Sequence, residues 1–386
     1  MKSYQPVRNT LICTVGTSLF YANLKTLSED TKNKPKNWKN IKSYFKNNKW
    51  EALSKELVQI DPTQRLCGAE INTIEEVRKK KSIQLENIFF LVSDTEDGRS
   101  TGRVLKHYFE NRQDLNLNQI DFEVVDDLDD KDPKKFRTVG LKNLVRKIGA
   151  YINRIGTQNI AIDATGGYKA QIAVALLIGQ ALDIPVFYKH ERFTEIIDFP
   201  PLPVMMDYDI LGRNAALFHD MEAGVMFTQR ELGEMEDKLT LFFTDVDIDG
   251  ETFYELHAIG YIYLFSFRQR FNYIPDLKSL DPSERKEPTF GNGHHFPSGF
   301  KPFVQKVWNE NKWIQTCWTI PYAGQKGIDG ISFEVHKDNS DHDILIGSFK
   351  TNNFGARFQI HLSDNRRESL NWAADYLNRE YRQKKK

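Results

Sequence analysis

Residues 159–171, NIAIDATGGYKAQ, carry the pattern that decides the fold of the first half of the chain. NIAID is a short apolar run typical of a buried strand, and the residues after Tyr168 place apolar side chains at helical spacing. The pair Gly166-Gly167 allows the tight turn that a strand needs when it leads directly into a helix. The stretch therefore predicts a strand, a turn and a helix of a parallel α/β sheet.

The same alternation of apolar runs and amphipathic segments extends over residues 1–200. Strands joined by helices form βαβ units, which predict a mostly parallel sheet. Ligands of such sheets bind beyond the carboxyl ends of the strands, so the loops there are the candidate site. Four further runs predict the remaining strands: NTLICTVG (9–16), NIFFLVSD (87–94), QIDFEVVDDL (119–128) and IPVFYKHE (184–191).

Length and composition limit what kind of protein this is. A chain of 386 residues predicts two or three domains. Its 53 Lys and Arg residues balance 53 Asp and Glu residues, so overall charge gives no argument for nucleic-acid binding. The sequence has no apolar run long enough for a membrane span, no signal-peptide pattern and no CxxC pair. We expect a cytoplasmic protein without membrane contact or disulfides.

The composition changes after a proline-rich segment at residues 200–203, which predicts a first domain over residues 1–204. Residues 205–275 combine helical patterns with a hairpin that turns at Asp249-Gly250. They predict a small winged-helix-like α+β module, and its lack of a basic stripe favours a linker role. Residues 276–386 predict a third domain, α+β, with a helix, three strands and a terminal helix.

Two segments are locally basic. Residues 344–386 contain nine Lys or Arg residues against four Asp or Glu residues, an excess typical of phosphate binding. Residues 25–51 are rich in lysine and asparagine with interleaved aromatics. This insertion fits a basic lid or nucleic-acid contact, but a solvated segment is the favoured interpretation because charge runs usually face water.

Three loops of the first domain combine glycines, hydroxyls and charge directly after predicted strands. Backbone N–H groups at such turns bind phosphate or ribose oxygens, and a helix N-terminus favours an anion. Together the loops predict a site for a nucleotide-like anion. The candidate ligand-binding residues are Thr14, Gly16, Thr17, Ser18, Asp94, Thr95, Gly166, Gly167, Tyr168 and Lys169.

These loops also resemble a known family. CTVGTS (13–18), GAEINTI (68–74), LVSDTEDG (91–98) and the NIAIDATGGYKAQ stretch are similar to the CARF domain of type III CRISPR ancillary effectors, over residues 8–204. The resemblance implies a Rossmann-like domain that binds cyclic oligoadenylate. It also implies a homodimer in which two copies form one two-fold pocket, lined by the loops of residues 14–18 and 166–169.

Three nuclease types compete for the C-terminal part. An Arg213 to His219 spacing fits the HEPN ribonuclease motif, although HEPN domains are all-helical. A metal-dependent PD-(D/E)xK nuclease needs an acid two residues before Lys350, where Ser348 stands; Asp329 and Asp343 are off the required spacing. A non-enzymatic transcription regulator ranks lowest, because FTQRELGEMED (227–237) is acidic where a recognition helix should be basic.

The favoured interpretation is a resemblance to RelE-like mRNA interferases. The order of a helix, GISFEVH, DILIGSFKT, FGARFQIHL and a final helix is similar to that superfamily, and the whole chain resembles CARF–RelE fusion effectors. The resemblance implies metal-independent cleavage of mRNA on the ribosome, with cyclic oligoadenylate as allosteric activator and no cofactor. The basic residues and one histidine of this region are the candidate catalytic groups: Lys350, Arg357, Arg367, Lys326 and His361. The other histidines of this region receive no role: His294, His295, His336 and His342.

Overall fold

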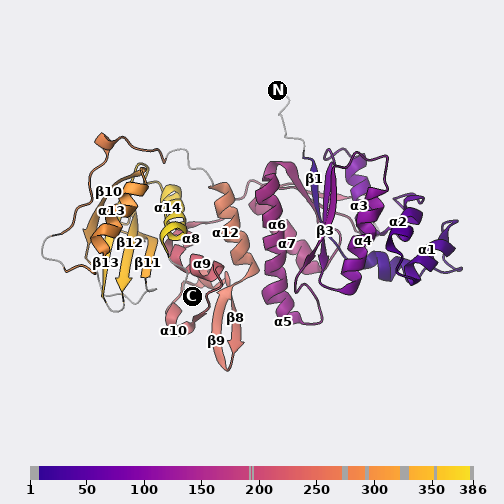
Figure 1. Ribbon diagram of the computed structural model, residues 1–386, viewed down its shortest axis with the longest axis horizontal. Coiled ribbons are helices and arrows are strands. Elements are labelled where there is room, and N and C mark those ends of the chain that lie inside the picture. The colour runs from indigo at the N-terminus through magenta and orange to yellow at the C-terminus, as the bar shows by residue number, and fades with distance from the viewer. Residues whose placement is uncertain are drawn as a thin grey trace. The chain divides into compact units, whose positions relative to one another are not determined.

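The computed structural model (Figure 1) describes residues 8–190, 193, 195–271, 277–291, 295–321, 330–351 and 354–382. Contacts divide the chain into two units, Met1–Met205 and Met206–Lys386. A further division at residue 275 stays a prediction. In the described ranges no helix is long and apolar enough to cross a membrane. All three cysteines, Cys13, Cys67 and Cys317, are buried and free.

The first unit is built on a six-stranded sheet whose strand order is β3-β2-β1-β4-β5-β6. Its first five strands are parallel, and β6 runs antiparallel to β5. The five strands predicted from the apolar runs are confirmed. The sixth was missed because it is only three residues long and lacks a buried run. The strands are β1 Thr10–Thr14, β2 Asn87–Ser93, β3 Gln119–Val125, β4 Ile160–Asp163, β5 Val186–Tyr188 and β6 Ile197–Phe199.

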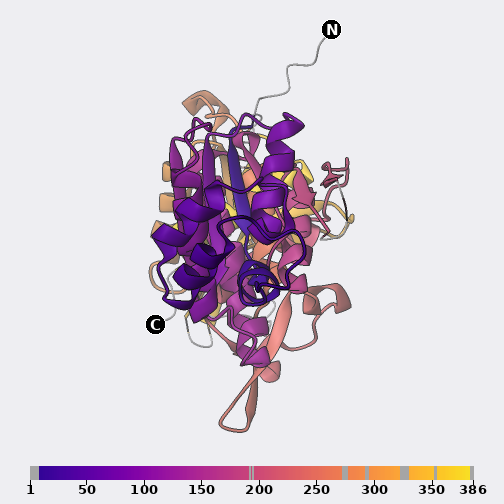
Figure 2. The same ribbon diagram turned by 90° about the vertical axis from the view of Figure 1, so that its right-hand side faces the viewer.

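Helices cover both faces of this sheet. Figure 1 shows α6 and α7 on one face and α3 and α4 on the other, and in Figure 2 the helices of the second group lie in front of the sheet. Both faces of the central strands β1, β2 and β4 are therefore buried, which explains why these strands are continuous apolar runs. The helical elements are η1 Leu19–Leu24, α1 Trp38–Lys46, α2 Trp50–Val58, η2 Arg65–Cys67, α3 Gly68–Lys79, α4 Glu96–Glu110, α5 Pro133–Lys135, η3 Phe136–Gly140, α6 Leu141–Ile155, η4 Thr157–Asn159 and α7 Lys169–Ala181.

The basic insertion of residues 25–51 is partly folded into α1 and the start of α2. Its aromatic side chains pack against the core that α3 and α4 share with the sheet, and the ring centroids of Phe20 and Trp50 lie 5.3 Å apart. Its lysines, among them Lys39 and Lys42, are exposed. The aromatics thus anchor the insertion while its charges face solvent, as the favoured interpretation expected.

The second unit begins with a three-stranded antiparallel sheet of order β7-β9-β8. Asp249 and Gly250 both have positive φ at the tip of the β8–β9 hairpin, as the sequence expected for this turn (Figure 2). The helix expected over residues 227–235 is instead a two-residue strand followed by one short helix. The elements are α8 Asp209–Arg213, α9 Ala215–Glu222, β7 Phe227–Thr228, α10 Gln229–Leu232, α11 Asp237–Thr240, β8 Phe243–Ile248, β9 Glu251–Leu256 and α12 Ala258–Arg270.

A four-stranded antiparallel sheet of order β10-β13-β12-β11 follows. Helices α13 and α14 pack against one of its faces around Phe333, Leu345 and Phe358. Strand β10 was missed, because the helix predicted over residues 300–314 ends at Glu310 and the chain turns into a strand. The elements are η5 Pro282–Glu284, α13 Phe300–Glu310, β10 Ile314–Ile320, β11 Gly330–Lys337, β12 Asp343–Thr351, β13 Phe354–Leu362 and α14 Arg367–Tyr381.

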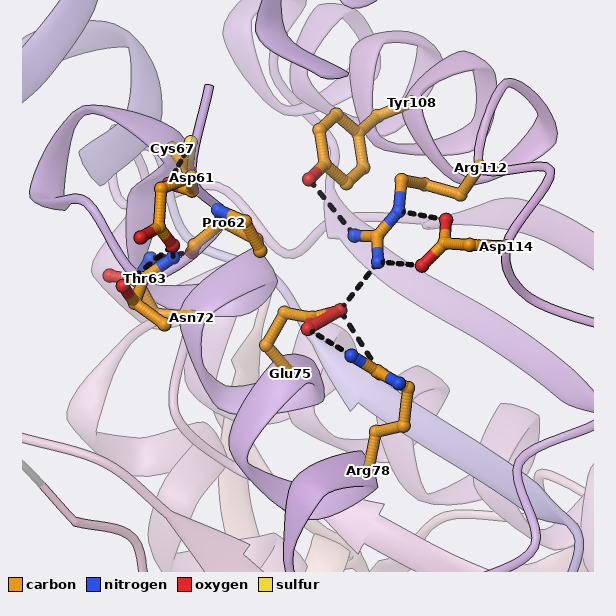
Figure 3. Close-up of polar contacts among 10 residues, drawn as sticks. All are labelled: Asp61, Pro62, Thr63, Cys67, Asn72, Glu75, Arg78, Tyr108, Arg112 and Asp114. Atoms are coloured by element: carbon orange, nitrogen blue, oxygen red, sulfur yellow. Dashed lines mark hydrogen bonds and ion pairs between the residues drawn. The ribbon is translucent and has the colours of Figure 1, made fainter. Parts of the chain in front are cut away.

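A buried ion network ties α3 to the end of α4 (Figure 3). Arg112 donates to Glu75 at 2.9 Å, to Asp114 at 2.6 Å and to the Tyr108 hydroxyl at 3.2 Å. The other oxygen of Glu75 accepts from Arg78 at 3.0 Å. Glu75 is 1% exposed and Arg112 is 8% exposed, so neither charge can turn to water without unfolding.

We expect Arg112→Ala to destabilise the first unit by about 3–5 kcal/mol, because it leaves the Glu75 charge buried without its main partner. Urea unfolding followed by circular dichroism measures the change. Lys55→Ala, which removes an exposed pair with Glu51, is the control and should leave unfolding nearly unchanged. Equal unfolding midpoints for the Arg112 variant and the wild type would contradict a structural role for the network.

Candidate functional site

Two glycine loops meet beyond the carboxyl ends of β1 and β4, which are neighbours at the centre of the sheet. The strand order reverses between them, because β2 and β3 follow on one side of β1 and β5 and β6 on the far side of β4. The Thr14 hydroxyl at the end of β1 donates to the carbonyl of Gly166 at 2.6 Å. A Cβ added to Gly16 would lie 2.8 Å from the backbone nitrogen of Gly167, and one added to Gly166 would lie 2.7 Å from that of Gly16. The two backbones thus approach as closely as only glycine permits. This point is where open α/β sheets bind ligands.

Two buried carboxyl groups lie beneath the loops. The backbone N–H of Gly16 donates to Glu70 Oε1 at 2.9 Å, and that of Thr165 donates to Asp163 at 3.0 Å. Both carboxyl groups are fully buried. Burial raises the pKa of Glu70. Burial, assisted by the charge of Glu70, raises the pKa of Asp163 to about 7 despite its hydrogen bonds from Thr165.

Above the loops lies a cavity of about 530 Å³, a volume typical of small-ligand sites. Loops that follow the four adjacent strands β1 to β4 line it, so the parallel topology brings them together. Four carboxylates and one lysine lie at its edge, which makes the lining more acidic than an anion site was expected to be. The lining residues are Val15, Gly16, Thr17, Tyr21, Ser93, Thr95, Glu96, Asp97, Asp129, Asp130, Lys131, Gly167 and Tyr168.

Half of the ligand-binding residues predicted from the sequence line this cavity: Gly16, Thr17, Thr95, Gly167 and Tyr168. Thr14 and Gly166 lie beneath it, in the contact between the loops. Ser18 lines a separate small cavity beside Asn23. Asp94 is held by Arg99 and by the backbone N–H of Asp127, and Lys169 is exposed at the start of α7.

The sequence reasoning missed the acidic residues of the cavity and Glu70. Asp129, Asp130 and Lys131 follow β3, so the rule that selected the other loops would also have selected theirs. The position of Glu70 was harder to find, because this residue lies in the first turn of α3 and no strand leads to it.

The second unit places several predicted catalytic residues on one face of its four-stranded sheet. Arg357 on β13 pairs with Ser348 on β12, and Lys350 follows two residues further along β12, so Lys350 and Arg357 are diagonal neighbours about 7–8 Å apart. Their strand positions alternate with those of Leu345 and Phe358, which face α13 and α14. Lys350 and Arg357 therefore point to the opposite face, which we call the outer face.

His336 also lies on this face and contacts Arg357, although no role was predicted for it. Its Nε2 lies 3.2 Å from a guanidinium nitrogen of Arg357 and 3.5 Å from a carboxylate oxygen of Glu334. The alternation in GISFEVH could have placed Glu334 and His336 on one face, opposite Phe333 and Val335. The group of Glu334, His336 and Arg357 is called the outer-face cluster below. Lys350 shares their face but lies six residues along β12 from Ile344, which pairs with His336, a separation of about 20 Å along the strand.

His361 and Trp318 lie on the same face, on β13 and β10, with ring centroids 6.1 Å apart. Burial lowers the pKa of His361. Its Nε2 lies 3.4 Å from the side-chain amide of Asn365. An imidazole beside an indole offers a surface on which a nucleotide base can stack.

Arg367 binds two aspartates and lies far from Lys350. At the start of α14 it donates to Asp343 at 2.7 Å and to Asp209 at 2.6 Å. Asp343 begins β12 and Lys350 lies seven residues further along it, a separation of about 23 Å along the strand. Lys326 and His294 lie outside the described residues, and His295 is exposed.

The residues of the two rival nuclease motifs have other surroundings. His219 is buried in α9 and burial lowers its pKa, while Arg213 pairs with Glu236 at 3.3 Å. Asp343 is held by Arg367 and by Lys337 at 3.0 Å. Asp329 lies outside the described residues. Over the part of the chain that the structure describes, no group of three His, Cys, Asp or Glu side chains could hold a metal ion.

The first unit has a Rossmann-like α/β sheet with a cavity beyond the carboxyl ends of its parallel strands. Residues 65–202 match the family described as CRISPR-associated protein (Cas_APE2256). This segment contains β2 to β6, Glu70 and the loop of Gly166 and Gly167, but not the loop after β1.

Solved structures also match the chain. One is Can2 from Sulfobacillus thermosulfidooxidans in complex with cyclic tetra-adenylate (cA4), with 10% sequence identity and a TM-score of 0.25. The match covers 70% of this chain and 65% of the Can2 chain. No curated protein matches the chain.

We expect Asp163→Asn to change how the stability of the first unit depends on pH. The folded-state pKa of about 7 lies above the unfolded value of about 4, so the contribution of Asp163 is fully present below pH ~4 and lost as the pH rises through 7. Asparagine keeps the shape of the side chain and does not titrate. Between pH 4 and pH 8 the free energy of unfolding of the variant, relative to that of the wild type, should therefore rise by up to about 4 kcal/mol. Urea unfolding at both pH values measures this gain.

Asp30→Asn, at an exposed position, is the control and should change nothing at either pH. If the free energy of unfolding of Asp163→Asn changes between pH 4 and pH 8 as much as that of the wild type, a raised pKa at Asp163 would be contradicted.

Proposed function

We propose that this chain is a cyclic oligoadenylate-activated endoribonuclease of type III CRISPR defence. In this proposal residues 1–204 form a CARF sensor, residues 205–275 a winged-helix-like linker, and residues 276–386 a RelE-like nuclease. The observation that carries the sensor function is the contact of two glycine loops below a cavity, at the centre of a sheet whose residues 65–202 match CRISPR-associated proteins.

The cavity has groups that suit both the phosphate and the adenine base of an adenosine phosphate. The N-terminus of α7 and those N–H groups of the glycine loops that are not bound to Glu70, Asp163 or Gln171 favour phosphate oxygens. The carboxylates of Glu96, Asp97, Asp129 and Asp130 repel phosphates but accept hydrogen bonds from exocyclic amino groups such as that of adenine. Phosphates therefore belong over the glycine loops and adenines at the acidic edge. A cyclic ligand with two-fold symmetry would be bound by a homodimer, in which the partner supplies the second half of the pocket.

We expect Tyr168→Ala to weaken binding of cyclic oligoadenylate about tenfold or more, because Tyr168 lines the cavity with an aromatic ring on which adenine can stack. Calorimetry with cyclic tri-, tetra- and hexa-adenylate measures affinity and should give one ring per two chains.

Lys42→Ala, on the exposed side of α1, is the control for this measurement and should bind as the wild type does. Wild-type affinity in the Tyr168 variant would remove the cavity as the binding site. A ratio of one ring per chain would contradict the shared pocket.

The order of elements supports the linker. Helix α9, strand β7, helices α10 and α11, and strands β8 and β9 follow one another as helix, strand, two helices and two strands, with β7 pairing with the last strand. This order is that of a winged helix. In such a module α11 would take the recognition position, but it has only four residues and follows Glu234 and Glu236. A connecting role fits these residues better than DNA binding.

The outer-face cluster has the groups that RNA cleavage needs. In that reaction the ribose 2′-OH loses its proton and attacks the adjacent phosphorus, and the bond from phosphorus to the 5′-oxygen breaks as that oxygen takes a proton. His336, held between Glu334 and Arg357, can transfer these protons. Arg357 places positive charge where the phosphorane develops negative charge, and Lys350, further along β12, adds positive charge to the same face. Trp318 and His361 offer a stacking surface for the neighbouring base. In this proposal the substrate is mRNA, on the ribosome, and the reaction uses no metal ion.

We expect Arg357→Ala to lower RNA cleavage by about 10²–10³-fold while cyclic oligoadenylate binding stays unchanged, because it removes a charge that stabilises the transition state. A cleavage assay with activator, with and without ribosomes and with EDTA, measures the rate. Wild-type activity should survive EDTA, since the charges belong to the chain.

Arg367→Gln is the matched control, because this arginine of the same region is bound to Asp343 and Asp209 rather than to Glu334 or His336. It should cleave at close to the wild-type rate. Full activity of the Arg357 variant would refute the cluster, and loss of wild-type activity in EDTA with rescue by Mg²⁺ would favour the PD-(D/E)xK alternative.

A further inference from the structure

Beneath the glycine loops lies a group of buried polar side chains that touch no part of the cavity. Among the described residues, Glu70 Oε2, Asp163 Oδ2 and Gln171 Nε2 are buried without a hydrogen-bond partner. A buried polar atom without a partner costs free energy, and native proteins keep few of them. Their occurrence together below one site calls for a functional explanation.

Glu70 contacts both loops through one oxygen. Its Oε1 accepts the backbone N–H of Gly16 at 2.9 Å. The same oxygen lies under Gly166, where an added Cβ would come within 2.2 Å of it. The carboxylate therefore fills the space between the loop after β1 and the loop after β4.

Gln171 supports the neighbouring part of the second loop in a similar way. Its Oε1 accepts the backbone N–H of Tyr168 at 2.5 Å, and a Cβ added to Gly167 would lie 2.2 Å from that oxygen. Gln171 is bound to its own loop only. Glu70 reaches the site from α3, a different element, and so it can set the distance between the two loops.

The sequence around Glu70 gives a natural comparison. Glu75 lies five residues further along α3 and is equally buried, but its carboxylate pairs with Arg78 and Arg112 (Figure 3). Glu75 has the ion pairs that a structural carboxylate is expected to have. Glu70 Oε1 accepts a hydrogen bond from the backbone of Gly16, and Glu70 Oε2 is buried without a partner. An unpartnered buried oxygen lowers the stability of the fold, so its presence here suits a role at the ligand loops.

We propose that Glu70 is a positioning residue of the ligand site, whose Oε1 holds the backbone of Gly16 at the distance from Gly166 that ligand binding requires. This inference rests on the proposed binding of cyclic oligoadenylate by the first unit. In this proposal the position of Glu70 Oε1, rather than the charge of the carboxylate, holds the loop of Gly16 in place.

Two variants separate these possibilities. Glu70→Gln keeps an oxygen at the same reach and removes the charge, whereas Glu70→Asp keeps the charge and withdraws the oxygens by about 1.5 Å. If the place of the oxygen matters, the Gln variant binds cyclic tetra-adenylate within about threefold of the wild type, and the Asp variant binds about tenfold more weakly or worse. Glu75→Gln is the control, expected to lower the unfolding midpoint without changing affinity.

Amide hydrogen exchange without ligand gives a second measurement that does not depend on the ligand's identity. Peptides over residues 14–18 and 164–168 should exchange about tenfold faster in the Asp variant and at nearly the wild-type rate in the Gln and Glu75 variants. Unchanged exchange in the Asp variant, or faster exchange in the Gln variant, would overturn the role of Glu70. If the variants show the expected exchange rates but the wild type binds no cyclic oligoadenylate, the role of Glu70 would stand and the proposed ligand would be refuted.

Discussion

The first unit depends on the contact between two backbones that carry no side chains where they meet. Gly16 and Gly166 approach so closely that a single Cβ on either would collide with the other loop. This contact exists because β1 and β4 are adjacent parallel strands, so the loops that follow them lie side by side. The strand order reverses between these two strands, at the centre of the sheet. The cavity above the loops and the carboxylate below them are both defined by this one meeting point.

The central strands of the first unit could be predicted from sequence because burial on both faces makes β1, β2 and β4 continuous apolar runs. The glycine loops could be found because a strand-to-helix turn requires glycine at fixed places. Strand β10 could not, since its residues follow a helix without a turn signal. The contacts of Glu70 and the contact of His336 with Arg357 could not be predicted either, because they depend on helix packing and strand register, which act between residues distant in sequence.

Register also explains why the basic C-terminal region does not act as one patch. Residues 344–386 have an excess of positive charge, but the sheet divides its members. Arg357 contacts His336 on the outer face and Lys350 lies further along β12, whereas Arg367 is neutralised by Asp343 and Asp209 at the opposite end of β12 from Lys350. A count of charges along the chain therefore overstates the cations that one phosphate could meet.

The burial of all three cysteines has a consequence for their reactivity. Burial raises the pKa of Cys13, of Cys67 to about 12 and of Cys317 to about 12, so almost no thiolate exists at neutral pH. Peroxide and alkylating reagents attack the thiolate, and they would find neither the reactive form nor access to it. An oxidising burst in the surroundings should therefore leave these three side chains unmodified.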